Sequence, residues 1–259
     1  VDPLARVLGE RMTQAFGQQV IVDNRAGGNT VIGTDFVAKA PADGYTLLLT
    51  ASSHVTQPQL LTAPFDPIKD FAPVATVSAS DMILCVHPSV PANNLQELLA
   101  LAKAKPGGLN FSSAGSGNPN HLAGELLSMM ANVKFTHVPY KGGAPAMQDL
   151  LANRFTGYFS APPTSIPHVE SGKLVAIATT GLTRPSYLSN VPTVAESGFP
   201  GFEAPAWWAL LASAKTPPEI VKRMNEELGK VLQNPEVSQR LILQACRSSM
   251  FPKLLSLLK

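Results

Sequence analysis

Apolar and polar positions follow two different periods along this chain, and the two periods alternate. Apolar residues recur at helical spacing from Leu4 to Met12, and Gly17 is placed to end that helix. Short uninterrupted apolar runs, such as residues 45–50 and 174–179, are instead typical of strands buried on both faces. Helices that alternate with such strands predict an α/β fold with a parallel or mixed sheet.

The same two patterns place the other expected elements. Further strands are expected at residues 19–23, 74–77, 82–86, 135–140 and 155–159, and residues 207–212 form a further apolar segment. Further helices are expected at residues 30–39, 94–105, 122–130, 144–152 and 218–232.

Two segments of the chain are candidates for crossings between two lobes. They lie near residues 84–87 and 204–211. The predicted first lobe therefore takes residues 1–84 and 207–259, and the predicted second lobe takes residues 85–206.

Composition narrows the classes of function. The 259 residues are 45% hydrophobic and 15% charged, which is typical of a globular protein. The net charge is only +2 and no basic run is present, so a nucleic-acid partner is not expected. No apolar run approaches the roughly 18 residues of a membrane span.

The cysteines and the start of the chain add two expectations. Cys85 and Cys246 are far apart in sequence and fit no metal spacing, so two buried thiols are expected, with a disulfide left open. The chain opens on a helix cap, Asp2 followed by Pro3, without a secretory signal, so we expect preceding residues to have been lost.

One small-residue loop is the strongest candidate for chemistry. It lies between an expected strand and an expected helix and consists of Ser113, Ala114, Gly115, Ser116, Gly117 and Asn118. The two glycines allow close approach of a ligand to the backbone, and a helix N-terminus carries partial positive charge. Free backbone N–H groups here are therefore expected to bind a carboxylate or a phosphate.

Two other strand ends are also rich in small polar residues. One carries Ser52, Ser53 and His54, and the other begins at Ser160. Ligands of open α/β sheets bind at strand ends, although an ordinary surface loop explains these two segments equally well.

Enzyme signatures are weak. The candidate loop is not a G-x-S-x-G elbow, no phosphate-binding P-loop is present, and Gly115-Ser116-Gly117 lacks the third glycine of a dinucleotide-binding fingerprint. His121 and Glu125 share a helix face without a third ligand, which favours a helix-cap interaction over a metal site. A hydrolase that pairs Ser113 or Ser116 with His121 stays a minor alternative, and no cofactor is expected.

Several longer motifs occur in one order along the chain. They are V-D-P-L-A-R at 1–6, V-D-N-R-A-G-G-N at 22–29, A-D-G-Y-T-L-L-L at 42–49, F-D-P-I-K-D-F-A-P-V at 65–74, S-A-G-S-G at 113–117, H-L-A-G-E at 121–125, H-V-P-Y-K-G at 137–142, S-G-K-L at 171–174 and V-P-T-V-A-E-S-G at 191–198. Over about residues 1–242 the chain resembles the substrate-binding proteins of tripartite tricarboxylate transporters, the Bug-type solute receptors.

The resemblance implies a two-lobed periplasmic-binding-protein fold of type II-like topology, with mixed sheets and a hinge of two crossover segments. It implies a periplasmic, non-catalytic monomer that delivers a carboxylated solute to the membrane subunits of its transporter. Di- and tricarboxylates, amino acids and aromatic acids are the expected solutes. In the family, backbone amides and waters from two facing loops hold a ligand carboxylate, and the second loop matches Ser113–Asn118 here. Residues 52–54 resemble another wall of that pocket.

Three departures from the family pattern are visible. The third wall reads Ser160-Ala161-Pro162 where the family usually carries an acidic residue and an asparagine, so selectivity should differ. The family's first facing loop and its central strand would precede the position of Val1, so we expect the first lobe of this chain to be incomplete. After Leu243 the sequence also departs from the family. A truncated, non-functional receptor remnant is therefore the main alternative.

Overall fold

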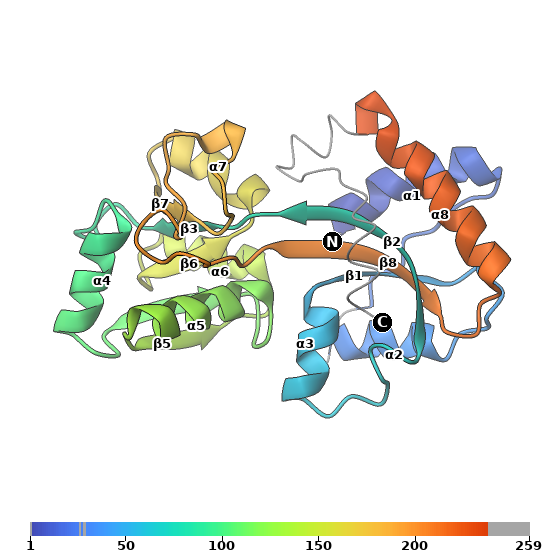
Figure 1. Ribbon diagram of the computed structural model, residues 1–259, viewed down its shortest axis with the longest axis horizontal. Helices are drawn as coiled ribbons and strands as arrows, with labels where there is room; N and C mark the ends of the chain where they lie inside the picture. The colour runs from blue at the N-terminus through green and yellow to red at the C-terminus, as the bar shows by residue number, and fades with distance from the viewer. Residues whose placement is uncertain (1, 26, 28–29, 238–259) are drawn as a thin grey trace. The chain divides into compact units, whose positions relative to one another are not determined.

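The computed structural model describes residues 2–25, 27 and 30–237, and the chain divides into two compact units (Figure 1). Unit 1 consists of the described residues up to Ala79 together with those from Trp207 onward. Unit 2 consists of Ser80–Ala206. The chain thus passes from one unit to the other at 79–80 and again at 206–207.

Unit 1 combines a three-stranded sheet with four helices. Its elements are α1 (Asp2–Phe16), α2 (Val31–Ala38), β1 (Leu47–Ala51), α3 (Ser53–Leu60), β2 (Phe71–Ser80), β8 (Ala206–Ser213) and α8 (Pro218–Gln233). The strand order is β1-β8-β2, and β1 runs antiparallel to β8 from Leu47 opposite Ala212 to Ala51 opposite Trp208. The helices α1 and α8 pack against one another.

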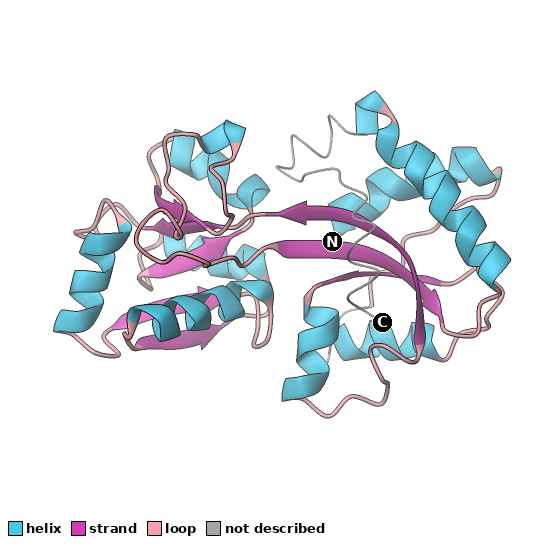
Figure 2. Ribbon diagram, viewed as in Figure 1, coloured by secondary structure: helices cyan, strands magenta, loops and turns pink. Residues whose placement is uncertain are grey.

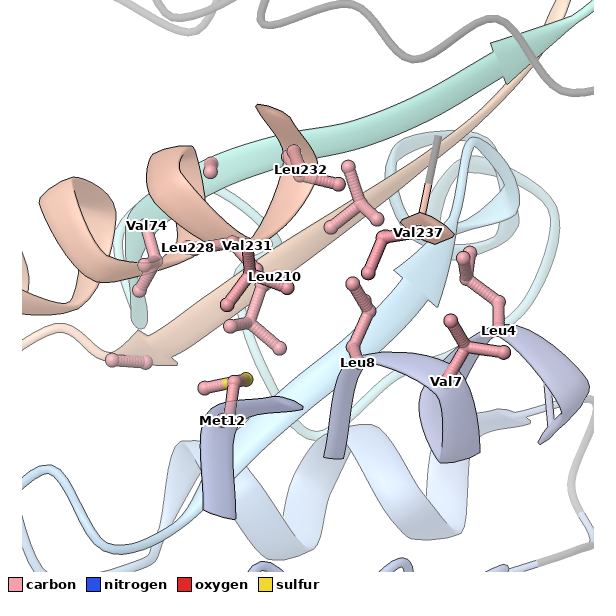
Figure 3. Packing of buried hydrophobic residues seen from close by; sticks show 13 residues of the cluster. Leu4, Val7, Leu8, Met12, Val74, Leu210, Leu228, Val231, Leu232 and Val237 are labelled. Atoms are coloured by element: carbon pink, nitrogen blue, oxygen red, sulfur yellow. The ribbon is translucent and has the colours of Figure 1, made fainter. Parts of the chain in front are cut away.

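The apolar face of α1 forms much of the core of unit 1. Leu4, Val7, Leu8 and Met12 meet residues of β2, β8 and α8, which include Val74, Leu210, Leu228, Val231 and Leu232 (Figure 3). The helical spacing of these apolar residues in the sequence thus becomes one continuous buried face. Burial of each large aliphatic side chain contributes about 1.5–3 kcal/mol to the stability of the unit.

The strand expected at residues 19–23 is not formed, and this prediction was wrong. In the part of the chain that the structure describes, the segment pairs with no strand, and Ile21 is 79% exposed. The Val20 N–H donates instead to Thr13 Oγ1 at 2.9 Å. Apolar, β-branched residues favour a strand, but they do not supply the neighbouring strand that must accept its hydrogen bonds.

Unit 2 is a five-stranded mixed sheet with helices between the strands (Figure 2). Its elements are β3 (Ile83–Val86), α4 (Leu95–Ala104), β4 (Leu109–Ser113), α5 (Pro119–Ala131), β5 (Phe135–Pro139), α6 (Gly143–Leu151), β6 (Gly157–Ser160), α7 (Pro162–Glu170) and β7 (Val175–Thr179). The strand order is β5-β4-β6-β3-β7; β4 is parallel to β5 and β6, and β3 is antiparallel to β6 and β7. The α/β class and the mixed sheet expected from the sequence are confirmed.

The helix α4 shows how local sequence sets an element. Asn94 caps its first turn by accepting from the Glu97 N–H at 2.9 Å, and the Glu97 carboxylate accepts from the Asn93 N–H at 2.7 Å. The buried residues Leu95, Leu98 and Leu99 then recur on one face. A cap followed by an apolar stripe is a local pattern that favours a helix.

Two helices were missed in the sequence, α3 and α7. Both begin directly after a strand, and the sequence analysis treated their first residues as loops. Pro58 lies inside α3 and Pro167 inside α7, and proline in a helix interior argues against a helix in any sequence-based assignment. Both helices have only a weak apolar stripe, so periodicity did not offset that signal.

The expectations for the two cysteines can be compared with the structure only at Cys85. Cys85 is buried in β3 without a disulfide, and burial raises the pKa of its thiol to about 12. Cys246 and the sequence after Leu243 lie outside the described residues. Among the described helices, none has the length and apolar character needed to cross a membrane.

Candidate functional site

The carboxyl ends of four parallel strands of unit 2 lie at one edge of its sheet. Ser113 ends β4 opposite Pro139 of β5, and Ser160 ends β6 opposite Ile83. Ile83 also lies opposite Thr179, the last residue of β7. The topology therefore brings Ser113 and Ser160, which are 47 positions apart by their numbers (160 minus 113), to the same edge of the sheet.

The loop after β4 is folded around its own serine. Ser113 Oγ accepts from the Gly115 N–H at 3.1 Å and donates toward the Gly115 carbonyl at 3.0 Å. The Asn118 N–H and the Asn118 side-chain amide both donate to that carbonyl at 3.3 Å. Gly115 has φ of 137° and Gly117 has φ of 76°, and such values explain why glycine occupies both positions.

These contacts correct one expectation from the sequence. The N–H groups of Gly115, Gly117 and Asn118 are all engaged, by Ser113 Oγ, by His121 Nδ1 and by the Gly115 carbonyl respectively. They set the shape of the loop instead of pointing freely at a ligand. Ser116, at the tip of the loop, is exposed, whereas Ser113 is fully buried.

Two histidines lie beside this loop and stack on one another. His121 is in the first turn of α5, and its Nδ1 accepts from the Gly117 N–H at 3.1 Å. His137 is on β5, and its Nε2 lies 2.6 Å from Ser113 Oγ. The two ring centroids are 3.9 Å apart with 27° between the ring planes. His121 Nε2 is 3.6 Å from Glu125 Oε1, which is the helix-start contact expected from the sequence.

The electrostatic setting of His137 favours its neutral form. Burial, and after it the neighbouring His121 ring, lowers the pKa of His137 from 6.5 to about 4. The imidazole is therefore uncharged in the folded protein at neutral pH. The uncharged ring forms a hydrogen bond with the Ser113 hydroxyl and places no charge beside the loop.

This shift predicts a pH-dependent stability. Between the ordinary pKa of 6.5 and the folded-state value of about 4, the unfolded chain binds a proton at His137 that the folded protein does not. The free energy of unfolding should therefore fall as the pH is lowered through that window. We expect scanning calorimetry to give a steeper fall in Tm from about pH 7 to about pH 5 for the wild type than for His137→Gln. Equal slopes for the two proteins would contradict this assignment.

Ser160 lies at the third predicted wall and is fully buried. Its hydroxyl bonds to Thr164 Oγ1 at 2.9 Å and to the Ala161 carbonyl at 3.2 Å. The following helix α7 begins with Pro162 and Pro163, which have no N–H groups, so its first two positions offer no amide donors. This wall is uncharged from 160 to 162 and poorer in donors than the loop after β4.

The residues predicted in unit 1 lie at the junction of β1 and α3. The Ser52 N–H donates to the Trp207 carbonyl at 2.9 Å, and the Ser52 hydroxyl is buried without a hydrogen-bond partner in the described part of the chain. Ser53 is the first residue of α3 and is buried.

His54 is buried in the core of unit 1. Its ring lies edge-on to Phe71, with centroids 4.8 Å apart, and its Nε2 contacts the Pro67 carbonyl at 2.9 Å. A carbonyl accepts, so Nε2 carries the proton, and burial lowers the pKa of the ring despite that bond. Such a ring positions the start of α3 instead of reaching toward a solute.

Three residues at the sheet edge of unit 2 are not predicted from the sequence. Asn120 donates to the Phe159 carbonyl at 2.7 Å and so ties the first turn of α5 to the end of β6. His137 carries no local signal that links it to the loop after β4. Thr179 is fully buried, and its hydroxyl has no partner among the described residues. Only Asn120 carried a local signal, since it follows proline at a helix start.

The Ser113–His121 pairing of the hydrolase alternative is not observed. Ser113 bonds to His137 and not to His121, and it is fully buried. His121 Nδ1 is occupied by the Gly117 N–H. A nucleophile needs an exposed hydroxyl beside a free base, and the Ser113–His121 pair does not provide that.

The chain matches the family model described as the tripartite tricarboxylate transporter family receptor over residues 4–246. Three solved structures are similar to it. Rpa4515 of R. palustris, with adipate, is 32% identical with a TM-score of 0.91, covering 99% of this chain and 87% of that one. The periplasmic binding protein BugD is 33% identical with a TM-score of 0.86, covering 95% and 83%. MatC of Rhodopseudomonas palustris, with bound malate, is 28% identical with a TM-score of 0.90, covering 99% and 90%.

These similarities confirm the periplasmic-binding-protein fold that the motifs imply. The family is described as a receptor family and BugD as a periplasmic binding protein, which agrees with the weakness of the enzyme signatures in the sequence. By its sequence motifs, its fold and the extent of the family match, this chain belongs to the receptor family of the tripartite tricarboxylate transporters.

Proposed function

We propose that this protein is an extracytoplasmic receptor that binds a small dicarboxylate through the loop of residues 113–118 in unit 2. The observation that carries the proposal is the fold of this loop. It lies between a strand end and the N-terminus of α5, and two glycines with positive φ expose its tip at Ser116. Such a loop suits a carboxylate because the N-terminus of α5 is electropositive. The neighbours Rpa4515 and MatC, with adipate and malate, support this ligand class.

The roles of the predicted residues follow from their contacts. Ala114, Ser116 and Asn118 are the proposed ligand contacts of the loop. Ser113 and Gly115 set its shape through their mutual hydrogen bonds. Ser160, together with Ser52 and Ser53 of unit 1, stays a prediction from the family resemblance, and His54 enters the proposal as a positioning residue.

The third wall favours a dicarboxylate over an amino acid. Residues 160–162 carry no carboxylate that could pair with the ammonium group of an amino acid. They also carry no negative charge that would repel a second ligand carboxylate. We therefore rank linear dicarboxylates such as malate and adipate above glutamate.

The cellular role completes the proposal. A receptor of this family delivers its solute to the membrane subunits of a tripartite transporter, and we propose the same for this chain, acting as a monomer in the periplasm. The proposal requires a protein free in that compartment, and the described helices include none that could cross a membrane.

Isothermal titration calorimetry tests this function. At about pH 7 we expect saturable one-site binding of malate or adipate, and at least about tenfold weaker binding of glutamate, which corresponds to ~1.4 kcal/mol. A neutral polyol serves as the control and should give no saturable heat. Absence of saturable binding by every carboxylate to a folded sample would contradict the proposal and favour a non-functional remnant.

A further inference from the structure

Two histidines from different elements hold the same loop at two points. His137 extends from β5, which lies beside β4, and His121 extends from α5, which packs on both strands. Their rings stack with centroids 3.9 Å apart. This arrangement joins the start of α5 to β5 directly beside residues 113–117.

Each imidazole controls one of the two glycine amides that flank Ser116. His121 Nδ1 accepts directly from the Gly117 N–H at 3.1 Å. His137 Nε2 bonds at 2.6 Å to Ser113 Oγ, and that oxygen accepts from the Gly115 N–H at 3.1 Å. The tip of the loop is thus fixed on both sides through the histidine pair.

The contact of His121 requires one protonation state. A backbone N–H can only donate, so His121 Nδ1 must be unprotonated for the bond to Gly117 to form. A proton on Nδ1 would set two donors against one another. The charged side chain recorded beside the pair is Glu125 on α5, 3.6 Å from His121 Nε2, while the contact from β4 is the uncharged Ser113 hydroxyl.

A second proton on the pair would add repulsion. Two imidazolium rings with centroids 3.9 Å apart would place like charges at van der Waals distance, and they would repel one another. The loop structure therefore requires an unprotonated His121 Nδ1, and it disfavours a positive charge on both stacked rings at once.

We propose that His121 and His137 are positioning residues that hold the tip of the 113–118 loop in its carboxylate-receiving form, and that protonation of the pair releases it. The inference rests on the proposed function for its effect on ligand binding. Its effect on the loop itself can be measured without a ligand.

Matched substitutions separate hydrogen-bond position from simple packing. The amide oxygen of Asn falls near the position of an imidazole Nδ1, whereas the amide of the longer Gln reaches the position of Nε2. His121→Asn should therefore keep the acceptor for Gly117, and His121→Gln should lose it. At position 137 the order reverses, because the contact uses Nε2: His137→Gln should keep it and His137→Asn should lose it.

The first readout is hydrogen exchange of the Gly115 and Gly117 amides by NMR in the ligand-free protein. We expect faster exchange at Gly117 in His121→Gln than in His121→Asn, and faster exchange at Gly115 in His137→Asn than in His137→Gln. Equal exchange for Asn and Gln at both positions would overturn the inference, because loss of ring packing alone does not predict a reversed order. If His137→Asn does not fold, the two variants at position 121 decide the test.

The second readout is malate affinity. His121→Gln and His137→Asn should bind about tenfold more weakly than their matched partners, as expected for loss of one positioning hydrogen bond. On lowering the pH from about 7.5 to about 5.5, the wild type should lose affinity relative to the double variant His121→Asn/His137→Gln, which cannot titrate at these positions. Protonation of malate changes the affinity of both proteins equally, so it does not affect the ratio of their affinities at each pH. A constant ratio would contradict the release by protonation.

The two proposals fail in different ways. If the wild type binds no carboxylate, the proposed function fails, and the exchange pattern of the glycine amides still decides the positioning roles. If the wild type binds malate but the four single variants bind alike, the positioning inference fails and the proposed function stands.

Discussion

Replacing Gly117 with valine is expected to weaken dicarboxylate binding about 100-fold and to leave the protein folded. Gly117 has φ of 76°, a left-handed conformation that costs an L-residue roughly 1–2 kcal/mol and a β-branched residue more. The loop should relieve this strain by moving, and it then loses the Gly117 N–H bond to His121 Nδ1, worth about 0.5–1.5 kcal/mol. Together these effects are about 2–3 kcal/mol, and ~1.4 kcal/mol corresponds to tenfold in affinity. Titration calorimetry with malate measures the effect.

Gly172 offers a matched control for this substitution. It has φ of 70° in the turn after α7, and a β-carbon there would meet nothing within 4 Å. Gly172→Val therefore introduces similar backbone strain away from the 113–118 loop. It should lower the free energy of unfolding by a similar amount and leave malate affinity unchanged. A Gly117→Val protein that binds malate like the wild type would show that the loop does not contact the ligand.

Truncation of Leu228 to alanine should lower the free energy of unfolding by about 2–5 kcal/mol. Leu228 is fully buried where α8 packs with α1, β2 and β8 (Figure 3). Removal of its side chain leaves a cavity among Leu8, Val74 and other aliphatic residues that cannot fully close. Denaturant unfolding followed by circular dichroism measures the change.

Leu60 provides the control in the same unit. It is the last residue of α3 and is 55% exposed, so Leu60→Ala removes the same atoms without opening a cavity. Its effect should stay within about 0.5 kcal/mol. Equal effects of the two substitutions would mean that the α1–α8 core is not formed as described.

The sequence was sufficient for those elements whose signal is local. The helix α4 has its cap at Asn94 and a buried stripe, and β7 is an uninterrupted apolar run, so both were predicted within about two residues of their bounds. The helices α3 and α7 were missed because Pro58 and Pro167 argue against a helix, while tertiary packing and the strand ends before them favour one. The segment 19–23 shows the converse, since strand propensity without a pairing partner did not produce a strand.

The candidate site was predictable only in part, because some of its contacts join residues that are distant in sequence. The loop after β4 was recognised from its own residues, because glycines between a strand and a helix start are a local signal. The role of Ser113 in shaping the loop was not predicted from the sequence, because it depends on His137, which lies on another strand. The expectation of free amides was wrong at Gly115 and Gly117 because no sequence pattern reveals that a serine and a histidine bind them.

The structure shows what surrounds residues 160–162, where the sequence departs from the family pattern. The sequence predicts altered selectivity because an acidic residue is replaced by Ser160. In the structure Ser160 is buried and bonded to Thr164, and Pro162 and Pro163 remove two amide donors from the start of α7. The wall thus has no carboxylate to pair with an ammonium group and no negative charge to repel a ligand carboxylate, and a carboxylate bound there takes its hydrogen bonds from donors elsewhere.

Backbone amide mapping by NMR tests directly whether the loop of residues 113–118 binds the ligand carboxylate. A protein labelled with 15N is titrated with malate, and chemical-shift changes are followed for every assigned amide. We expect saturable changes that are largest for residues 114–118 and the first turn of α5, and about 100-fold more malate should be needed to produce them in Gly117→Val. Saturable changes confined to other parts of the chain, or none in a folded sample, would contradict the assignment of this loop as the carboxylate site.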